Sequence, residues 1–219
     1  MTTRCPNPAC KLLFDVADDR EGKNGPCPSC GQVITFRSLA LLNEVERQHL
    51  KRTLAAPAEP AGAARYCALL EDIRSLWNVG SIFRSADGAG FPQLYLCGIT
   101  GCPPHKSIAK TSLGAEDHVA WQHLTGVLDI LPTLRSRGVQ IVALEKTESS
   151  VPLEETLGTG SIHAPLCLLV GNEVAGLSAE ALSMADRVCH LPMRGIKTSL
   201  NVAVAFGIAA YAIRERTHL

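Results

Sequence analysis

The chain has 219 residues, of which 46% are hydrophobic and 19% are charged, and its 21 basic side chains balance 21 acidic ones. This composition is typical of a soluble globular protein. The apolar runs are too short or too interrupted to cross a membrane, and residues 1–10 lack the apolar segment of a signal peptide. We therefore expect a cytoplasmic protein with one domain of ordinary size and a small additional module.

The first thirty residues contain four of the nine cysteines. Cys5 and Cys10 form a C-x4-C pair, and Cys27 and Cys30 form a C-x2-C pair. Both spacings suit a structural zinc site, in which four thiolates complete a tetrahedral shell. The segment has few apolar residues, so the metal would supply its folding energy. The alternative is four unconnected thiols in a flexible tail, but two pairs at this spacing favour a zinc-ribbon-like module over residues 1–37.

Residues 38–64 separate this module from the rest of the chain. Apolar residues recur at helical spacing over residues 38–54, which predicts a short amphipathic helix. Residues 55–64 consist almost entirely of Pro, Ala and Gly, which is typical of a linker. We therefore expect a second domain over residues 65–219.

From residue 65 onward, short apolar runs alternate with helical patterns. The candidate strands cover residues 66–70, 94–98, 140–144, 166–170 and 188–191. The candidate helices cover residues 79–89, 125–137, 179–185 and 200–215. This alternation predicts an α/β domain with a mainly parallel sheet, in which ligands bind at the carboxyl ends of the strands.

The helix over residues 79–89 carries one notable cation. Asn78 and Gly80 mark its start, and Arg84 lies among small and apolar residues. An arginine on a packed helix needs an anion, which would be either a bound ligand or a neighbouring carboxylate. Asp87 and Asp72 are the candidates for a structural ion pair.

Two glycines flank an acidic residue after the strand over residues 166–170. Gly171 and Gly176 permit either a tight turn or the close approach of a ligand to the backbone near Glu173. The chain has no G-x-G-x-x-G fingerprint and no P-loop lysine, which argues against a dinucleotide-binding fold or a nucleoside triphosphatase.

Residues 98–117 read as a polar loop. The loop contains His105, Lys106 and Lys110, which are suited to contact phosphate groups of a nucleic acid. The alternative is an ordinary solvated surface loop.

The stretch over residues 191–215 joins an irregular loop to the most apolar segment of the chain. Residues 200–213 are apolar or small on nearly every side, which predicts a buried helix. Ser199 and Asn201 lie at its start, and buried polar side chains need partners. They would therefore serve as helix caps or as ligand contacts.

Three of these segments together resemble a known family. Asn78 to Arg84 (NVGSIFR), Gly171 to Leu177 (GNEVAGL) and Pro192 to Ala203 (PMRGIKTSLNVA) are similar, in order and spacing, to the three motifs of the SpoU family. This family comprises RNA ribose 2′-O-methyltransferases of the SPOUT superfamily. The resemblance covers roughly residues 66–215 and does not extend to the cysteine-rich module.

The resemblance implies a fold and a cofactor. In this family the C-terminal segment forms a deep trefoil knot, a rare exception to the rule against knots. The knot binds S-adenosyl-L-methionine (AdoMet), and together with the final helix it forms a homodimer interface. The positions that match the cofactor pocket are Leu144, Gly171, Asn172, Glu173, Leu191, Pro192, Met193, Ser199 and Leu200.

The resemblance also implies catalytic roles. Methyl transfer requires the ribose 2′-oxygen and the methyl donor to be held in line. The family assigns the proton of the 2′-hydroxyl to the arginine at Arg84, with Ser199 and Asn201 in support. A guanidinium remains protonated in proteins, so our hypothesis is that Arg84 stabilises the developing oxyanion and contacts a phosphate. Asn78 and Glu173 would position Arg84 or the substrate.

The sequence therefore predicts AdoMet-dependent methylation of a ribose 2′-hydroxyl in structured RNA, either tRNA or rRNA, with Lys106 and Lys110 as candidate RNA contacts. The alternative is a non-catalytic RNA-binding or adaptor protein on the same fold. The intact motif residues argue against this alternative. The zinc module would either contact RNA or serve only as a folded unit that packs on the catalytic domain.

Overall fold

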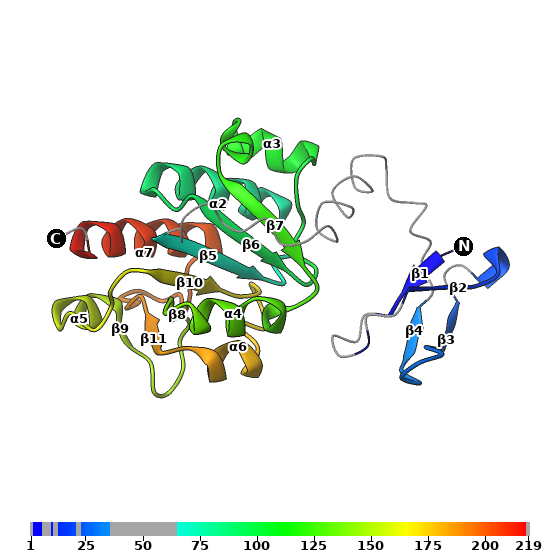
Figure 1. The fold of residues 1–219 in the computed structure, drawn as a ribbon. Helices are drawn as coiled ribbons and strands as arrows, with labels where there is room; N and C mark the ends of the chain where they lie inside the picture. The colour runs from blue at the N-terminus through cyan, green and yellow to red at the C-terminus, as the bar shows by residue number, and fades with distance from the viewer. Residues whose placement is uncertain (1, 6–9, 11–12, 21–22, 36–64, 218–219) are drawn as a thin grey trace. The chain divides into compact units, whose positions relative to one another are not determined.

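The computed structural model describes residues 2–5, 10, 13–20, 23–35 and 65–217 (Figure 1). The chain divides into two compact units, residues 1–58 and 59–219. The helix predicted over residues 38–54 and the linker predicted over residues 55–64 lie outside the described residues. In the part of the chain that is described, no helix combines the length and the apolarity needed to cross a membrane.

The N-terminal unit contains two small antiparallel hairpins. Strand β1 (Thr2–Arg4) pairs with β2 (Leu13–Asp15), and β3 (Asn24–Pro26) pairs with β4 (Val33–Thr35). The buried hydrophobic residues described in this unit are Cys5, Cys27 and Ile34. So small a core cannot stabilise a fold without a further source of energy.

The C-terminal unit is built on a seven-stranded sheet in the order β7-β6-β5-β10-β8-β11-β9. Its strands are β5 (Tyr66–Glu71), β6 (Gln93–Cys97), β7 (Ala120–Leu124), β8 (Gln140–Leu144), β9 (Val151–Pro152), β10 (Leu166–Val170) and β11 (Arg187–His190). Every pair is parallel, which confirms the predicted α/β class. The sequence prediction missed β7 and β9, because β7 is only partly buried and β9 has two residues.

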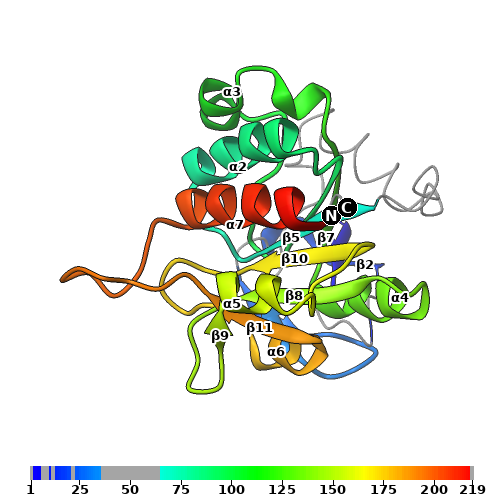
Figure 2. The same ribbon diagram turned by 90° about the vertical axis from the view of Figure 1, so that its left-hand side faces the viewer.

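Helices cover both faces of this sheet. They are α2 (Leu76–Ala89), α3 (Lys106–Ser112), α4 (Leu131–Ser136), α5 (Leu153–Gly158), α6 (Ala179–Met184) and α7 (Val202–Thr217). Helices α2, α3 and α7 lie on one face, and α4 and α6 lie on the other (Figure 2). The side chains of β10 alternate between the two cores: Leu168 faces the first, whereas Leu169 faces the second.

Two predicted helices differ in extent from the structure. Helix α2 begins at Leu76 instead of residue 79, because the Ser75 hydroxyl caps it by accepting the Asn78 N–H. Residues 125–137 form a short 3-10 turn followed by α4, where Pro132 occupies the first helical turn.

Part of the predicted polar loop, residues 106–112, is helix α3. Its Ile108 and Ser112 are buried, and it packs closely on α2. A Cβ atom at Gly80 would collide with the Ile108 carbonyl oxygen and the Thr111 hydroxyl, so glycine is required at this contact. The single buried apolar side chain among polar neighbours left no periodic pattern from which the helix could be predicted.

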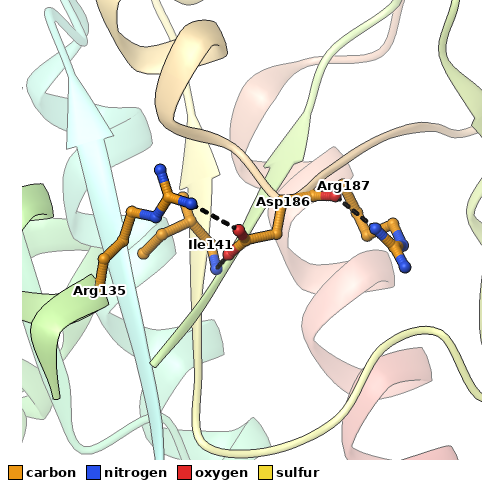
Figure 3. A network of polar contacts seen from close by, with 4 residues as sticks. All are labelled: Arg135, Ile141, Asp186 and Arg187. Atoms are coloured by element: carbon orange, nitrogen blue, oxygen red, sulfur yellow. Dashed lines mark hydrogen bonds and ion pairs between the residues drawn. The ribbon is translucent and has the colours of Figure 1, made fainter. Parts of the chain in front are cut away.

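A polar network fixes the starts of β8 and β11 (Figure 3). The Asp186 carboxylate accepts the Ile141 N–H at 2.7 Å and a guanidinium N–H of Arg135 at 3.2 Å. The Arg187 guanidinium donates to the Asp186 carbonyl oxygen at 2.7 Å. The Arg135 ion pair is partly exposed and contributes little, so the main role of Asp186 is to hold the two strands in register.

Candidate cofactor and catalytic site

A cavity of about 460 Å³ lies at the carboxyl ends of β8, β10 and β11. Leu144, Gly171 and Leu191 mark the strand ends, and residues 198–202 line it from the loop before α7. Ligands of parallel α/β sheets bind at this edge, and the volume is within the range of small-molecule sites.

Eight of the nine positions predicted for the cofactor pocket line this cavity, namely Leu144, Gly171, Asn172, Glu173, Leu191, Met193, Ser199 and Leu200. Pro192 is not among the lining residues. The sequence prediction did not include Glu145, Lys146 and His190, which also line the cavity. Each of these directly follows or ends a strand, so the carboxyl-end rule applied to single residues would have found them.

The loop after β10 is a tight turn held by Asn172. The Asn172 side-chain oxygen accepts the N–H groups of Val174 and Ala175, each at 2.9 Å. Its amide group donates to the Asp72 carbonyl oxygen at 2.7 Å. Gly171 is required here because a Cβ would collide with the backbone at Gly176. Asn172 therefore shapes the cavity by fixing its backbone.

The Glu173 carboxylate binds the start of α2. It accepts the backbone N–H groups of Arg74 and Ser75 at 3.1 and 3.2 Å, and the Asn78 side-chain amide at 2.9 Å. Burial raises the pKa of this carboxyl, but the donors from Arg74, Asn78, Ser75 and its own backbone outweigh burial and lower the pKa below its ordinary value. Glu173 is therefore an anchored carboxylate at neutral pH.

Asn201 joins the third motif to the first. Its amide group donates to the Asn78 side-chain oxygen at 3.0 Å, and its own oxygen caps α7 by accepting the N–H groups of Ala203 and Val204. Asn201 thus serves both as a helix cap and as part of the site. Asn78 lies between Glu173 and Asn201, and the three side chains form one chain of hydrogen bonds.

The predicted burial of this region is wrong in two respects. Ser199 and Asn201 are exposed, and they lie at the mouth of the cavity. Helix α7 is also not buried on all sides, because Val204, Ile208 and Tyr211 are each about half exposed. Its buried side packs Phe206 against Phe91 in an edge contact, with ring centroids 5.9 Å apart. Composition alone could not separate a fully buried helix from one with an unpartnered apolar face.

Arg84 is exposed on α2 and does not line the cavity. Of the two partners considered for Arg84, the structural ion pair is not observed: within the described residues, the guanidinium contacts no carboxylate. Asp72 instead adopts a left-handed conformation (φ 54°), and its carboxylate accepts the Ile99 N–H at 2.9 Å. Six helical positions separate Arg84 from Asn78, which places it about 120° around the axis and about 9 Å along it.

Lys106 and Lys110 lie exposed on α3. The Lys110 ammonium lies 5.6 Å from the centroid of the Trp77 ring on α2. The structure thus brings one of the two candidate RNA contacts to the helix that also carries Asn78 and Arg84.

The four N-terminal cysteines form a separate cluster. Their sulfur atoms all lie within 4.8 Å of one another, and the Cys5–Cys30 and Cys10–Cys27 distances are both 3.6 Å. A tetrahedral zinc ion with Zn–S bonds of about 2.3 Å requires sulfur separations of about 3.8 Å, so the donor set fits zinc.

The C-x2-C turn favours the thiolate form of Cys27. Burial raises the pKa of this thiol, but the backbone N–H groups of Cys30 and Ser29 and the thiols of Cys5 and Cys10 together lower it to about 7. Gly31 follows with φ 73°, and its N–H donates to the Cys27 carbonyl oxygen at 2.9 Å. The left-handed conformation at Gly31 closes this turn.

Comparison with known proteins shows which family the C-terminal unit resembles. Residues 66–211 match the SpoU rRNA Methylase family. A protein of Mycobacterium tuberculosis described as an uncharacterized tRNA/rRNA methyltransferase is 31% identical over 94% of this chain and 71% of its own length. The tRNA (guanosine(18)-2′-O)-methyltransferase of Escherichia coli is 29% identical over 72% of this chain and 71% of its own length.

Solved structures show the same fold. The AdoMet-bound rRNA methyltransferase from Sinorhizobium meliloti aligns with a TM-score of 0.62 and 32% identity over 70% of this chain, which covers 56% of that protein. The A. aeolicus TrmH/SpoU tRNA modifying enzyme aligns with a TM-score of 0.61 and 27% identity over 78% of this chain and 83% of its own.

Proposed function

The chain belongs to the SpoU rRNA Methylase family, and we propose that it transfers a methyl group from AdoMet to a ribose 2′-hydroxyl of a structured tRNA or rRNA. The observation that carries this proposal is the hydrogen-bonded chain of Glu173, Asn78 and Asn201 at the mouth of the cavity. Three segments far apart in the sequence meet there, and each is one of the motifs that the family shares.

The cavity fits AdoMet on geometric grounds. Gly171 permits the tight turn that borders the cavity, because any side chain there would collide with the backbone at Gly176. The cavity lining combines the apolar side chains of Leu144, Leu191 and Leu200 with polar groups. We infer that these residues, with Asn172, Glu173, Met193 and Ser199, hold the cofactor. When bound, AdoMet supplies an electrophilic methyl group. We also infer that residues 191–201 form the knot of the family.

Arg84 is proposed to stabilise the 2′-oxyanion that develops during transfer and to contact an adjacent phosphate. Its guanidinium cannot serve readily as a base, because it remains protonated. Its exposure, together with the absence of an ion pair among the described residues, leaves it available to RNA. Asn78 and Glu173 are proposed to position the ribose, with Ser199 and Asn201 in support.

Helix α7 is proposed to form a homodimer interface together with the knot. Leu200, Val204, Ile208 and Tyr211 recur at helical spacing and leave an apolar stripe at the surface. Such a stripe is expected to bury itself against a second copy. Sedimentation velocity should show a dimer for the wild-type protein and a monomer for Ile208→Glu. A wild-type monomer would contradict this interface.

The cysteine cluster is proposed to bind one structural Zn²⁺ within a ribbon-like module, residues 1–37, joined by residues 38–64 to the methyltransferase domain. Four clustered thiols are suited to act as metal ligands in a reducing compartment, which supports a cytoplasmic location.

The experiment that tests the proposal uses the full-length protein with tritiated AdoMet. Two substrates are compared, the tRNA fraction and the rRNA fraction of cells that lack the protein. We expect label in one fraction, and mapping of 2′-O-methyl sites then identifies the nucleotide. Calorimetry with AdoMet addresses the adaptor alternative: RNA binding without AdoMet binding would support the adaptor and contradict the proposed enzyme.

A further inference from the structure

Trp77 is an unusual side chain for the surface of an enzyme. Its ring is 51% exposed, although tryptophan is a large aromatic residue that usually packs in a core. It lies in the first turn of α2, directly before Asn78, whose amide connects Glu173 and Asn201. An exposed aromatic ring therefore lies one residue from the proposed reaction site.

The position of Trp77 is fixed by α3. The Thr111 hydroxyl donates to the Trp77 carbonyl oxygen at 3.1 Å, and the close approach at Gly80 holds the two helices together. On α3, the Lys110 ammonium lies 5.6 Å from the ring centroid. The ring is thus presented on a two-helix support with a cation over one of its faces. A planar group could stack on the other face and place a neighbouring negative charge within reach of Lys110.

The two segments that carry Trp77 and Lys110 are basic, and the neighbouring Glu173 carboxylate is already occupied by hydrogen bonds from the start of α2. Residues 73–86 and 98–115 include Arg74, Arg84, Lys106 and Lys110 and contain no aspartate or glutamate, although acidic and basic residues are equal in number over the whole chain. Arg74, Arg84, Lys106 and Lys110 are all exposed. Local concentration of positive charge, and not the net charge, determines whether a surface attracts a polyanion.

We propose that Trp77 is a stacking platform for an unpaired base of the RNA substrate, and that Lys110 contacts the phosphate beside that base. This inference rests on the proposed function and adds a substrate-positioning residue to it. Every base presents a π face, whereas bases within a duplex are already stacked on their neighbours. The platform therefore selects RNA in which a base near the target ribose is unpaired, such as a loop or a bulge.

Trp77 can report on the contact directly, since the chain has two tryptophans and the other is Trp121. In a Trp121→Phe variant, Trp77 is the sole indole fluorophore. We expect an eight-nucleotide oligoadenylate to quench its emission at low salt, and an RNA duplex of the same length and concentration to leave it largely unchanged. Equal quenching by both probes, or by neither, would overturn the stacking role.

The functional test compares Trp77→Ala, Trp77→Phe and Leu128→Ala in the full-length protein with the RNA fraction that accepts label. Leu128 is a matched control because it is 48% exposed and lies in the 3-10 turn on the other face of the sheet. Loss of one stacked base should raise KM for RNA by about 5- to 150-fold in Trp77→Ala. Trp77→Phe should retain part of the affinity, and Leu128→Ala should match the wild type.

AdoMet affinity and thermal unfolding separate this inference from the proposed function. Both should be unchanged in Trp77→Ala, because the ring lines neither the cavity nor the core. If the wild-type protein methylates RNA and Trp77→Ala has the same KM, the stacking inference fails while the proposed function stands. If the wild-type protein transfers no methyl group to either fraction, the proposed function itself fails, whatever the fluorescence shows.

Discussion

The two units of this protein are held together by different means. The buried apolar residues described in the N-terminal unit are two cysteines and one isoleucine, Cys5, Cys27 and Ile34. The sheet unit has an extended apolar core on each face, with fully buried side chains such as Phe83, Leu69 and Phe206. Each such side chain contributes about 1.5–3 kcal/mol, which favours a sheet unit that folds without a ligand. The cysteine unit has no such core among its described residues, and we propose that a metal ion stabilises it.

The two proposed sites differ in whether nearby or distant parts of the sequence form them. The proposed metal ligands come in two pairs, with four residues between Cys5 and Cys10 and two between Cys27 and Cys30, so that site is specified by local spacing. The hydrogen-bonded network of the proposed catalytic site joins Asn78 to Glu173, 95 residues away, and to Asn201, 123 residues away. It exists only when the sheet brings β5, β10 and α7 together. Damage to the first site should unfold a unit, whereas damage to the second should alter chemistry in a folded unit.

Removal of the metal ligands should have the largest effect. In Cys27→Ser/Cys30→Ser, zinc content should fall from about one ion per chain to none, and residues 1–37 should unfold, because structural zinc contributes about 10–16 kcal/mol to folding. Elemental analysis measures the zinc content, and NMR of the full-length protein shows whether residues 1–37 unfold. Cys102→Ser, outside the cluster, should keep its zinc. Retained zinc in the double variant would rule out the ribbon.

Within the sheet unit, substitution of Arg84 should lower catalysis strongly and leave stability unchanged. Arg84→Ala should lower kcat by about 100- to 1000-fold, because a donor to the developing oxyanion is lost. Thermal unfolding should be unchanged, since the side chain is exposed and has no ion pair among the described residues. Arg84→Lys retains the charge but loses the planar, two-pronged donor, so it should also be strongly impaired. Near-normal turnover by Arg84→Lys would contradict the oxyanion role.

The Glu173 carboxylate should couple the stability of the wild-type protein to pH, and Glu173→Gln should remove this coupling. The folded pKa of Glu173 is lowered, so its carboxylate stabilises the folded state above the ordinary pKa of 4.5, and this stabilisation is lost as the pH falls through the folded value. At pH 7 the variant should lose about 1 kcal/mol in the free energy of unfolding. Urea titrations should show that the difference in the free energy of unfolding between variant and wild type shrinks below pH 4.5. A difference that does not change with pH would contradict the lowered pKa of Glu173.

Two substitutions of Asn201 should separate its two roles, as the cap of α7 and as the hydrogen-bond partner of Asn78. Asn201→Ala removes the cap of α7 and should cost about 1 kcal/mol. Asn201→Ser keeps a capping oxygen but is too short to reach Asn78, so it should unfold like the wild type and transfer methyl groups more slowly. Thermal unfolding measures the capping role, and kcat measures the role of the hydrogen bond to Asn78. If Asn201→Ser were fully active, the hydrogen bond to Asn78 would have no part in catalysis.

The sequence predicted those features that local pattern determines. The strands over β8 and β10 and the cysteine cluster lie where spacing and apolar runs placed them. Helix α3 was missed because its stability comes from contact with Gly80, which no local pattern reveals. The alternative in which Arg84 pairs with Asp72 does not hold, because Asp72 adopts a left-handed turn and its carboxylate accepts the Ile99 N–H. The hydrogen bonds of Asn78 likewise depend on segments about 100 residues away.

The most direct test of the account is the position of the transferred methyl group. RNA labelled by the protein with tritiated AdoMet is hydrolysed in alkali, a reaction in which the neighbouring 2′-hydroxyl attacks the phosphodiester. A 2′-O-methyl group blocks this attack, so we predict that the label resides in alkali-resistant dinucleotides. Label recovered only in mononucleotides would place the methyl group on a base and contradict the proposed ribose 2′-O-methylation.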